Sequence, residues 1–530
     1  MIIRSPQPDI DIPDVDLTTF VLRHAETHAS KDALICGVTG ARYTYGELAT
    51  GIRRAAAGFA ARGIRKGDVV GIVSPNVPDF AVAFFGLTAI GAIPSTVNPM
   101  ATAEEIGAQF ADSEAVAIVT IPMFVEKCQA ASRLASTVRT IYAFGEAEGA
   151  EPFASLLTHG ESAPRAPIDA ASDVAVLPYS SGTSGIPKGV MLTHRNVIAN
   201  LVQTQSNPPM LTDADRVIAV LPFFHIYGMT VILAGGLAQG ATIVTLPRFE
   251  LEQFLSTIQT HRITYANVVP PIVLALAKHP MIDQFDLSSL RSVFSGAAPL
   301  GADLAGACAR RLDTRVRQGY GLTETSPVTH FHPDGGDIEE LASIGPLVAN
   351  TEARIVDTVS GEDAAAGERG ELWLRGPQVM KGYLNKPEAT AMCMTSDGWF
   401  KTGDVAIVDE KGWFRIVDRV KELIKYKGLQ VAPAELEAVL LSHPAVADAA
   451  VIPIADADAG EIPKAFVVTR GALTSDEIMA YVAERVSSYK KIRRVEFIDA
   501  IPKSPSGKIL RRLLVERERA AASAESTLPR

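Results

Sequence analysis

The sequence predicts an α/β protein whose parallel sheets are covered by helices, followed by a smaller α+β unit. Between residues 44 and 119, helical and strand patterns alternate, which is typical of sheets flanked by helices. The alternation continues through an apolar strand pattern at 217–221 and a helical pattern at 251–260. After about residue 351 the pattern changes to short strands separated by Gly-Asp turns, which favours a small sheet or barrel. A compact unit of domain size follows residue 421.

The first part should begin in the order helix, strand, helix, strand. Apolar residues at helical spacing indicate an amphipathic helix over 45–62 and a more apolar helix near 80–90. Short apolar runs indicate strands over 69–73 and 116–119.

The later elements are shorter and cross a domain boundary near 418–421. Before the boundary, strands are expected over 371–374 and 413–417. The tail from 516 to 530 is expected to continue as a helix and to end in mobile chain. Between boundary and tail we expect helices over 433–441 and 475–486, and strands over 449–452, 465–469 and 495–498.

Length and composition indicate a folded protein of several domains. A chain of 530 residues is too long for one hydrophobic core. Its 47% hydrophobic and 21% charged residues are typical of a globular protein, and its net charge of -10 argues against nucleic acid as the main partner.

The cysteines and the N-terminus predict a cytoplasmic protein without a membrane anchor. The first residues lack the apolar core of a signal peptide, and no uncharged apolar run is long enough to span a bilayer. The sequence contains no C-x-x-C pair, so neither a metal site nor a disulfide framework is indicated. The four cysteines are scattered, at Cys36, Cys128, Cys308 and Cys393.

Residues 179–190, which read YSSGTSGIPKGV, are the first candidate for chemistry. A P-loop needs a hydroxyl residue directly after its lysine, whereas Lys188 is followed by Gly189. Glycines here allow backbone N–H groups to approach an anion, and the hydroxyl side chains add donors. The segment also follows a buried strand pattern, and ligands of α/β proteins lie where strands pass into loops. These features favour phosphate binding over a flexible linker.

Four further segments, 223–228, 318–324, 401–404 and 505–508, combine reactive residue types with glycines or aromatics. Within them, the carboxylate of Glu324 could hold Mg²⁺, and the carboxylate of Asp404 could accept hydrogen bonds from a ribose diol. Taken singly, each also has an ordinary structural interpretation, as a core histidine, a glycine-rich turn, a Gly-Asp turn and a surface tail.

In this order and spacing, the five segments closely resemble those of the adenylate-forming superfamily of acyl-CoA synthetases, luciferases and peptide-synthetase adenylation domains. The resemblance extends from Leu17 to Arg512. It is strongest to the 4-coumarate:CoA ligases, in segments 179–190, 295–301, 318–324 and 417–428.

The resemblance implies a large N-terminal adenylation domain, residues 1–418, made of two helix-flanked sheets plus a small β-barrel at 351–418. A hinge at 419–421 should join it to a smaller, mobile α+β lid domain at 422–515. The remaining residues, 516–530, would form a flexible tail.

The resemblance also implies how ATP is held. The glycine-rich loop would wrap the β- and γ-phosphates, Thr323 would contact the α-phosphate, and Glu324 would bind Mg²⁺. Asp404 and Arg419 would contact the ribose. The full set implied for ATP or AMP is Ser180, Ser181, Gly182, Thr183, Ser184, Lys188, Gln318, Gly319, Tyr320, Thr323, Asp404, Arg419, Lys421, Lys425 and Lys508.

Two steps share the site in this family. Lys508 would stabilise the charge that develops when a carboxylate attacks the α-phosphate. Rotation about Lys421 would then replace Lys508 by the face that includes Lys425 and Gln430, and CoA would attack the adenylate. His225 is expected to gate the acyl site, and the residues implied in CoA binding are Arg248, Lys427 and Gly428.

The resemblance places the acyl substrate beside Tyr227, Ala297, Gly321, Pro327 and Val328, with Pro270 and Pro271 nearby. The Pro-Val pair matches enzymes that use hydroxycinnamates, so 4-coumarate or a related acid is the expected substrate. Departures from the family occur at Thr325-Ser326 and His330-Phe331, where bulkier residues on the pocket floor could exclude ring substituents or mark another aryl or medium-chain acid.

Four alternatives remain open at this stage. Within the fold they are a fatty acyl-CoA ligase, a luciferase-like monooxygenase, and an adenylation enzyme that loads a carrier protein. The fourth is a non-catalytic acyl-nucleotide binding protein, against which the joint presence of Lys188, Glu324, Asp404, Arg419 and Lys508 argues.

Overall fold

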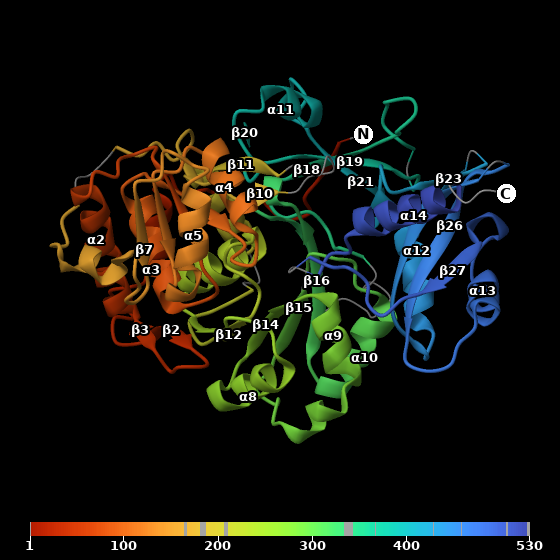
Figure 1. The fold of residues 1–530 in the computed structure, drawn as a ribbon, viewed down its shortest axis with the longest axis horizontal. Helices are drawn as coiled ribbons and strands as arrows, with labels where there is room; N and C mark the ends of the chain where they lie inside the picture. Colours follow the sequence, from red (N-terminus) through yellow and green to blue (C-terminus); the bar gives the residue numbers. More distant parts are fainter. Residues whose placement is uncertain are drawn as a thin grey trace.

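A computed structural model describes most of the chain, in which a large N-terminal body is followed by a separate C-terminal domain (Figure 1). Figure 1 shows the first sheet with α2 and α5 at one end of the molecule and the blue C-terminal domain at the other. The expected α/β architecture is therefore confirmed. The described residues are 2–163, 167–180, 187–205, 210–332, 343–365, 367–427, 429–456, 458–504 and 507–526.

The first sheet is parallel throughout, in the order β5-β4-β6-β7-β8. Its first helix starts with a capping box, in which Thr44 and Glu47 satisfy each other's backbone N–H groups. The strands are β4 (Val69–Val73), β5 (Ile93–Val97), β6 (Ala117–Thr120), β7 (Thr140–Ala143) and β8 (Glu151–Pro152), and the helices are α2 (Tyr45–Ala61), α3 (Pro78–Ala89), α4 (Ala103–Asp112) and α5 (Val125–Ser132).

Helix α3 is apolar all round because it is buried between the first and second sheets. It contacts β4 and β5 of the first sheet and β2 of the second. Phe80, Phe84 and Phe85 are fully buried and form a ring cluster that includes Phe223. This packing joins the two sheets through one core.

The second sheet has the order β17-β16-β15-β14-β12-β13-β2-β3 and is parallel from β16 to β2. Its edge strands, β17 and β3, are antiparallel to their neighbours. The strands are β2 (Asp32–Cys36), β3 (Arg42–Thr44), β12 (Arg216–Ala219), β13 (Thr242–Thr245), β14 (Tyr265–Val268), β15 (Ser292–Ser295), β16 (Arg315–Gly321) and β17 (Val328–Phe331). Its helical segments are α1 (Leu17–Val21), α6 (His194–Gln203), η3 (Tyr227–Ala234), α7 (Gly235–Ala238), α8 (Leu251–His261), α9 (Pro270–Lys278) and α10 (Ala302–Leu312).

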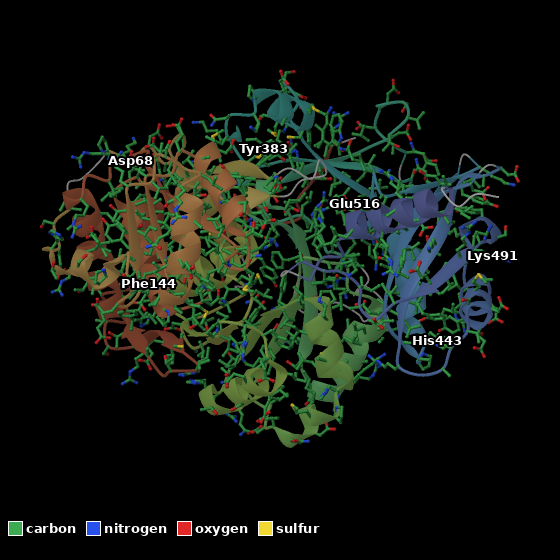
Figure 2. All side chains as sticks on the ribbon, viewed as in Figure 1. Asp68, Phe144, Tyr383, His443, Lys491 and Glu516 are labelled. Carbon is green, nitrogen blue, oxygen red and sulfur yellow. The ribbon has the colours of Figure 1, made fainter. Side chains whose placement is uncertain are left out.

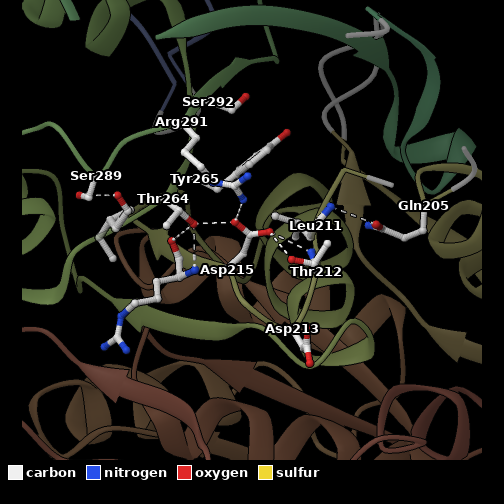
Figure 3. A network of polar contacts seen from close by, with 12 residues as sticks. Gln205, Leu211, Thr212, Asp213, Asp215, Thr264, Tyr265, Ser289, Arg291 and Ser292 are labelled. Carbon is white, nitrogen blue, oxygen red and sulfur yellow. Dashed lines mark hydrogen bonds and ion pairs between the residues drawn. The ribbon is translucent and has the colours of Figure 1, made fainter. Parts of the chain in front are cut away.

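The amino ends of these strands are tied together by the buried carboxylate of Asp215 (Figure 3). It accepts hydrogen bonds from Thr212 (backbone N, 2.9 Å) and Thr264 (Oγ1, 2.7 Å), and it pairs with Arg291. Burial alone would raise the pKa of Asp215, but these donors hold the pKa below its usual value. A cavity of about 500 Å³, lined in part by Arg291, Arg315 and Arg317, lies at this end of the sheet.

A third, antiparallel sheet contains the glycine-rich segment. Strands β10 (Tyr179–Ser180) and β11 (Lys188–Thr193) form a hairpin in which Ser180 is opposite Lys188. Strands β9 (Val174–Val176) and β20 (Gly382–Tyr383) also pair with β11. The expected strand at 174–177 is therefore present, but it leads into an antiparallel hairpin and not into a loop at the edge of a parallel sheet.

Residues before the boundary form an open half-barrel of five antiparallel strands, in the order β1-β18-β19-β21-β22. The expected barrel is not closed, because β1 and β22 are edges of this sheet. Helix α11 (Pro387–Cys393) follows β20. The strands are β1 (Ile3–Arg4), β18 (Glu352–Val356), β19 (Gly370–Arg375), β21 (Phe400–Val408) and β22 (Phe414–Arg419).

The C-terminal domain has a sheet and cores of its own. The tail was expected to start at residue 516, but its helix, α14 (Arg511–Ser526), begins five residues earlier. It begins earlier because Leu514 packs into the domain core. Helix α13 ends three residues earlier than predicted. The strands are β23 (Ile424–Tyr426), β24 (Leu429–Val431), β25 (Val446–Asp456), β26 (Gly460–Thr469) and β27 (Arg494–Phe497), and the other helices are α12 (Pro433–Ser442) and α13 (Ser475–Ala483).

Within the described part of the chain, no helix combines the length and the apolar character needed to cross a bilayer. The four cysteines are free thiols, and three of them are buried.

Candidate active site

The candidate site lies where the carboxyl ends of β15 and β16 meet the hairpin sheet and the half-barrel. The hydroxyl of Tyr320 on β16 donates to Asp404 on β21 of the half-barrel. In the turn after β16, Glu324 O accepts from the N–H of Met380, two residues before β20, over 2.8 Å. In open α/β sheets, ligands bind outside the carboxyl ends of the strands. The three sheets therefore enclose the position where sequence reasoning put the nucleotide.

Tyr320, Asp404 and Arg419 form one side of the site. Tyr320 Oη lies 2.5 Å from Asp404 Oδ2, and Arg419 Nε lies 3.4 Å from Asp404 Oδ1. Burial raises the pKa of Asp404, although Arg419 and Tyr320 oppose the shift. Burial also raises the pKa of Tyr320, so the phenol remains a donor. The carboxylate is held in one orientation by a neutral and a charged donor.

Glu324 forms the opposite side, beside the hairpin. It lies in the short helical turn η5 (Thr323–Thr325) and is almost fully buried. Its Oε1 accepts hydrogen bonds from Ser180 Oγ (2.8 Å) and from Tyr383 Oη (2.9 Å). Lys188 Nζ lies 4.7 Å from the centre of the Tyr383 ring. Sequence reasoning found Ser180, Lys188 and Glu324 but missed Tyr383.

Lys508 reaches this site from the C-terminal domain. Burial lowers the pKa of Lys508 to about 8, and the nearby charge of Arg419 acts in the same direction. The carboxylates of Asp404 and Glu324 oppose this shift. Lys508 therefore lies close enough to Asp404 and Glu324 for their charges to act on it.

The loop that carries Lys508 packs against the large domain. A Cβ added at Gly507, where φ is +80°, would lie 3.4 Å from Val269 Cγ2 and 3.7 Å from Pro271 Cδ. Within the loop, Lys508 N donates to Ser504 Oγ over 3.1 Å. Lys508 is therefore held by its backbone contact with Ser504 and by the packing of Gly507 against the large domain.

His225 lies at the approach to η3, close enough to Lys508 for their charges to interact. Burial, with the charge of Lys508 as a smaller cause, lowers the pKa of His225 to about 4. Its Nδ1 accepts a hydrogen bond from Tyr227 N over 3.3 Å. The imidazole is neutral at pH 7.

The backbone of 319–328 folds back on itself beside the acyl-site candidates. A side chain at Gly321 would collide with the carbonyl of Pro327. Asn200, which sequence reasoning missed, clamps this turn: its Nδ2 donates to Val328 O (2.6 Å) and its Oδ1 accepts from Val328 N (3.0 Å). No sequence signal marks Asn200, since its contact spans 128 residues.

Tyr227 and Ala297 complete the candidate acyl wall. Tyr227 Oη donates to Phe294 O over 3.1 Å. A Cβ at Gly296 would lie 2.8 Å from the Tyr227 ring, so the ring covers the backbone here. Ala297 has φ of +66°, a left-handed conformation that holds the chain at the end of β15.

The unusual residues after Glu324 are placed differently from expectation. Thr325 and Ser326 are buried and donate to the carbonyls of Pro327 (2.5 Å) and Gln378 (2.9 Å), so they fix the turn. The His330 ring packs at 4.5 Å from that of Phe414 and 5.7 Å from that of Tyr320. The ring of His330 therefore fills space between β16 and the half-barrel.

Other predicted residues lie at or beyond the edge of the site. The Gln318 amide exchanges hydrogen bonds with Leu300 N (3.2 Å) and Leu300 O (3.3 Å), so it braces the backbone. A Cβ at Gly319 would lie 2.7 Å from the Phe294 ring. Arg248 is exposed in the segment between β13 and α8.

The residues expected to serve the second step are on the β23–β24 hairpin. Lys425 and Gln430 are cross-strand partners, and Lys427 is exposed with φ of +49°. Among the described residues, the contacts of Lys425 and Lys427 are with Glu461 and Tyr426 of the C-terminal domain, so they are not gathered with Lys508. The candidates Ser181, Gly182, Thr183, Ser184 and Gly428 lie outside the described residues.

Comparisons with known proteins agree with this arrangement. The family model of AMP-binding enzymes matches residues 21–384, and that of the AMP-binding enzyme C-terminal domain matches residues 435–508. The chain therefore belongs to the family of AMP-binding enzymes.

Similarity to individual relatives extends over nearly the whole chain. It is 45% identical to 4-coumarate--CoA ligase 5 of Oryza sativa subsp. japonica, covering 96% of each chain, and 43% identical to 4-coumarate--CoA ligase 2 of Nicotiana tabacum, covering 97% of this chain and 96% of the relative. A crystal structure of an anthranilate CoA ligase in complex with anthranoyl-AMP matches with a TM-score of 0.90 at 25% identity, covering 97% of this chain and 99% of that one. The chain is an AMP-forming ligase.

Proposed function

We propose that the protein is an ATP-dependent acid:CoA ligase that converts 4-coumarate or a related hydroxycinnamate to its CoA thioester through an acyl-adenylate. The observation that carries this proposal is the convergence of Lys508, from the C-terminal domain, with Asp404 and Glu324, from the large domain. The similarity to 4-coumarate--CoA ligases over nearly the whole chain supports the choice of acid.

In the first step, a carboxylate oxygen of the acid attacks the α-phosphorus of ATP. A new P–O bond forms, the bond from the α-phosphorus to the oxygen shared with the β-phosphate breaks, and pyrophosphate leaves. Lys508, cationic below its pKa of about 8, stabilises the charge that develops on the phosphoryl oxygens. Thr323 contacts the α-phosphate, and Lys188 with the 180–188 loop holds the β- and γ-phosphates.

Asp404 and Arg419 orient the nucleoside. The carboxylate of Asp404, fixed by Tyr320 and Arg419, accepts hydrogen bonds from the ribose diol. Tyr320 and the adjacent backbone of Gln318 and Gly319 line the adenine side, and the absence of a side chain at Gly319 leaves room for the Phe294 ring behind this backbone.

The donor set around Glu324 fits a magnesium ion that arrives with ATP. Mg²⁺ is commonly bound by one or two carboxylates together with substrate phosphates, and no group of three His, Cys, Asp or Glu residues able to hold a metal occurs in the described ranges. Among the described residues, the hydrogen bonds to the Glu324 side chain fall on Oε1, so Oε2 is the oxygen that would bind the ion. When bound, Mg²⁺ would neutralise phosphate charge.

In the second step, the C-terminal domain rotates about the hinge at 419–421, with Lys421 as the pivot. The change of sheet supports this boundary: β22 ends at Arg419 in the half-barrel and β23 begins at Ile424 in the C-terminal sheet. Rotation carries Lys508 away and brings in the β23–β24 hairpin. Lys425 and Gln430 then face the adenylate.

The second step transfers the acyl group to CoA. Arg248, Lys427 and Gly428 contact the anionic cofactor. The sulfur of CoA attacks the acyl carbon, a C–S bond forms, the bond from the acyl carbon to the AMP oxygen breaks so that AMP leaves, and the thiol proton passes to water. His225, neutral at pH 7, gates the acyl site through its contact with Tyr227.

The acyl group lies beside Tyr227, Ala297, Gly321, Pro327 and Val328. The buried, hydrogen-bonded ring of Tyr227 and the turn clamped by Asn200 make a rigid wall that suits a flat aromatic acid. The free thiols of the chain support a cytoplasmic location.

The test is an assay of the purified protein with ATP, Mg²⁺ and 4-coumarate, with and without CoA, in which AMP and acyl products are followed by mass spectrometry. Cinnamate, benzoate and octanoate are the competing acids. We expect 4-coumaroyl-CoA to form only with CoA and faster than octanoyl-CoA. Faster use of octanoate would move the assignment to a fatty acyl-CoA ligase, and accumulation of adenylate that ignores CoA would point to a carrier protein.

A further inference from the structure

One phenol joins the two charged groups of the phosphate side of the site. Tyr383 donates from Oη to Glu324 Oε1 over 2.9 Å, and its ring lies under Lys188 with Nζ at 4.7 Å from the ring centre. Glu324 lies in η5 and Lys188 on β11. Tyr383 contacts both side chains, whereas Ser180, which is opposite Lys188 in the hairpin, contacts Glu324 by its hydroxyl. Figure 2 labels Tyr383 in the region where the hairpin sheet meets the half-barrel.

Tyr383 is held firmly from behind. Strand β20 pairs with β11 so that Tyr383 is opposite Val190, two residues from Lys188. Its backbone N donates to Thr390 Oγ1 over 2.9 Å, at the middle of α11. Met380, three residues earlier, donates its N–H to Glu324 O. The 380–383 segment therefore holds Glu324 by the backbone and by the side chain.

The protonation states suit a permanent donor. The hydroxyl of Tyr383 is the donor in its 2.9 Å hydrogen bond to Glu324 Oε1, and burial followed by the charge of Glu324 raises the pKa of Tyr383 in agreement with that role. The thiol of Cys393 at the end of α11 has its pKa raised to about 11, by burial and then by Glu324, and is neutral. A carboxylate oxygen that accepts hydrogen bonds from two hydroxyls, here Ser180 Oγ and Tyr383 Oη, is held in one orientation.

We propose that Tyr383 is a positioning residue that fixes Oε1 of Glu324, so that Oε2 meets the metal of the metal–nucleotide complex, and that aligns Lys188 with the phosphates. This inference rests on the proposed function. A hydrogen-bond partner behind a metal ligand typically changes metal affinity or activity by about 10- to 100-fold when it is removed. The phenol of Tyr383 has this relation to Glu324.

The test measures binding of α,β-methylene-ATP by calorimetry, in Mg²⁺ and in EDTA, so the readout is affinity and not turnover. The quantity of interest is the gain in affinity that Mg²⁺ produces. Tyr383→Phe keeps the ring under Lys188 and removes only the donor, so we expect unchanged binding in EDTA and a Mg²⁺-dependent gain reduced about tenfold. Tyr383→Leu should also weaken binding in EDTA, by about two- to fivefold, because Lys188 loses the ring beneath it.

Tyr43→Phe is the matched control. Its phenol also donates to a carboxylate, Asp79 Oδ1, over 2.7 Å, but it lies on the edge strand β3, so the gain should equal that of the wild type. Tyr383→His retains an N–H donor and should keep more of the gain than Tyr383→Phe. Thermal unfolding of each variant establishes that it is folded.

One result would overturn the proposal alone: a Mg²⁺-dependent gain in Tyr383→Phe equal to that of the wild type, which would show that the hydrogen bond to Glu324 does not position the metal ligand. Absence of nucleotide binding by the wild-type protein would instead overturn the proposed function. The two failures are therefore distinguishable.

Discussion

The guanidinium of Arg511 donates two hydrogen bonds to the carboxylate of Glu437, from Nη2 to Oε2 at 2.6 Å and from Nε to Oε1 at 3.2 Å. Both side chains are largely buried, at 16% and 8% exposure. Arg511 also pairs with Glu422, directly after the hinge. One arginine thus connects α14, α12 and the segment that leaves the large domain.

Arg511→Met should destabilise the C-terminal domain by about 3 to 5 kcal/mol, because it leaves the buried carboxylate of Glu437 without its charged partner. Chemical denaturation followed by circular dichroism measures this change. Arg512→Met is the control. Arg512 is 71% exposed, and its ion pair with Glu516, at 3.3 Å, lies at the surface. Its loss should change the free energy of unfolding by less than about 0.5 kcal/mol. Equal effects of the two substitutions would show that the buried cluster is not stabilising.

Lys508→Ala should slow adenylate formation by about 10²-fold or more, since it removes the cation that meets the developing phosphoryl charge. Thioester formation from supplied acyl-adenylate should be much less affected, because Lys508 belongs to the first step. Pyrophosphate exchange measures adenylate formation, and single-turnover thioester formation measures the second step. Lys503→Ala, in the same loop but paired with Asp448 at 2.6 Å, should leave exchange near the wild-type rate.

The pH dependence of the first step should follow the ammonium of Lys508. Because its pKa is lowered to about 8, the cation prevails below pH 8 and is lost as pH rises through that value. Exchange should therefore fall above pH 8 in the wild type. Lys508→Arg, which stays charged, should lower the rate but extend the plateau to higher pH. An unchanged descending limb in Lys508→Arg would assign that limb to another group.

Sequence patterns were sufficient for the regular elements that define the fold. Helix α2 and strand β4 are found within a residue of their predicted bounds, since amphipathic and apolar periodicity reflect burial directly. The antiparallel pairing of β9 and β10 with β11 was missed. A short apolar run shows that a strand is buried but not which neighbour it has.

Only part of the candidate site was predicted, because sequence motifs mark some of its residues and not the spatial neighbours of those residues. Glu324, Asp404 and Lys508 carry recognisable motifs, and the structure brings them together. Tyr383 and Asn200 carry none, because their roles arise from pairing of segments 59 and 128 residues apart. The bulky side chain of His330 suggested a narrowed pocket, whereas its direction depends on the register of β17 with β16.

His225→Ala should impair the acyl site without creating a new pH dependence. With its pKa lowered to about 4, the imidazole is neutral from pH 5 upwards and contributes no titration between pH 6 and 8. We expect the KM for the acid to rise and the thioester step to slow, because the ring that accepts from Tyr227 N is lost. Stopped-flow measurement of both half-reactions checks this, and unchanged half-reactions would exclude a gating role.

Gly321→Ala should disrupt the turn that joins the nucleotide and acyl sides. An added methyl would collide with the carbonyl of Pro327, which also accepts a hydrogen bond from Leu322 N (3.2 Å). Relief requires the 321–328 backbone to move, and overpacking of this kind costs about 1 to 3 kcal/mol. Gly301→Ala is the control, since a Cβ there meets nothing within 4 Å. We expect Gly321→Ala to lower both the melting temperature and exchange, and Gly301→Ala to lower neither; if both variants kept full activity, the close backbone approach at Gly321 would have no role in shaping the site.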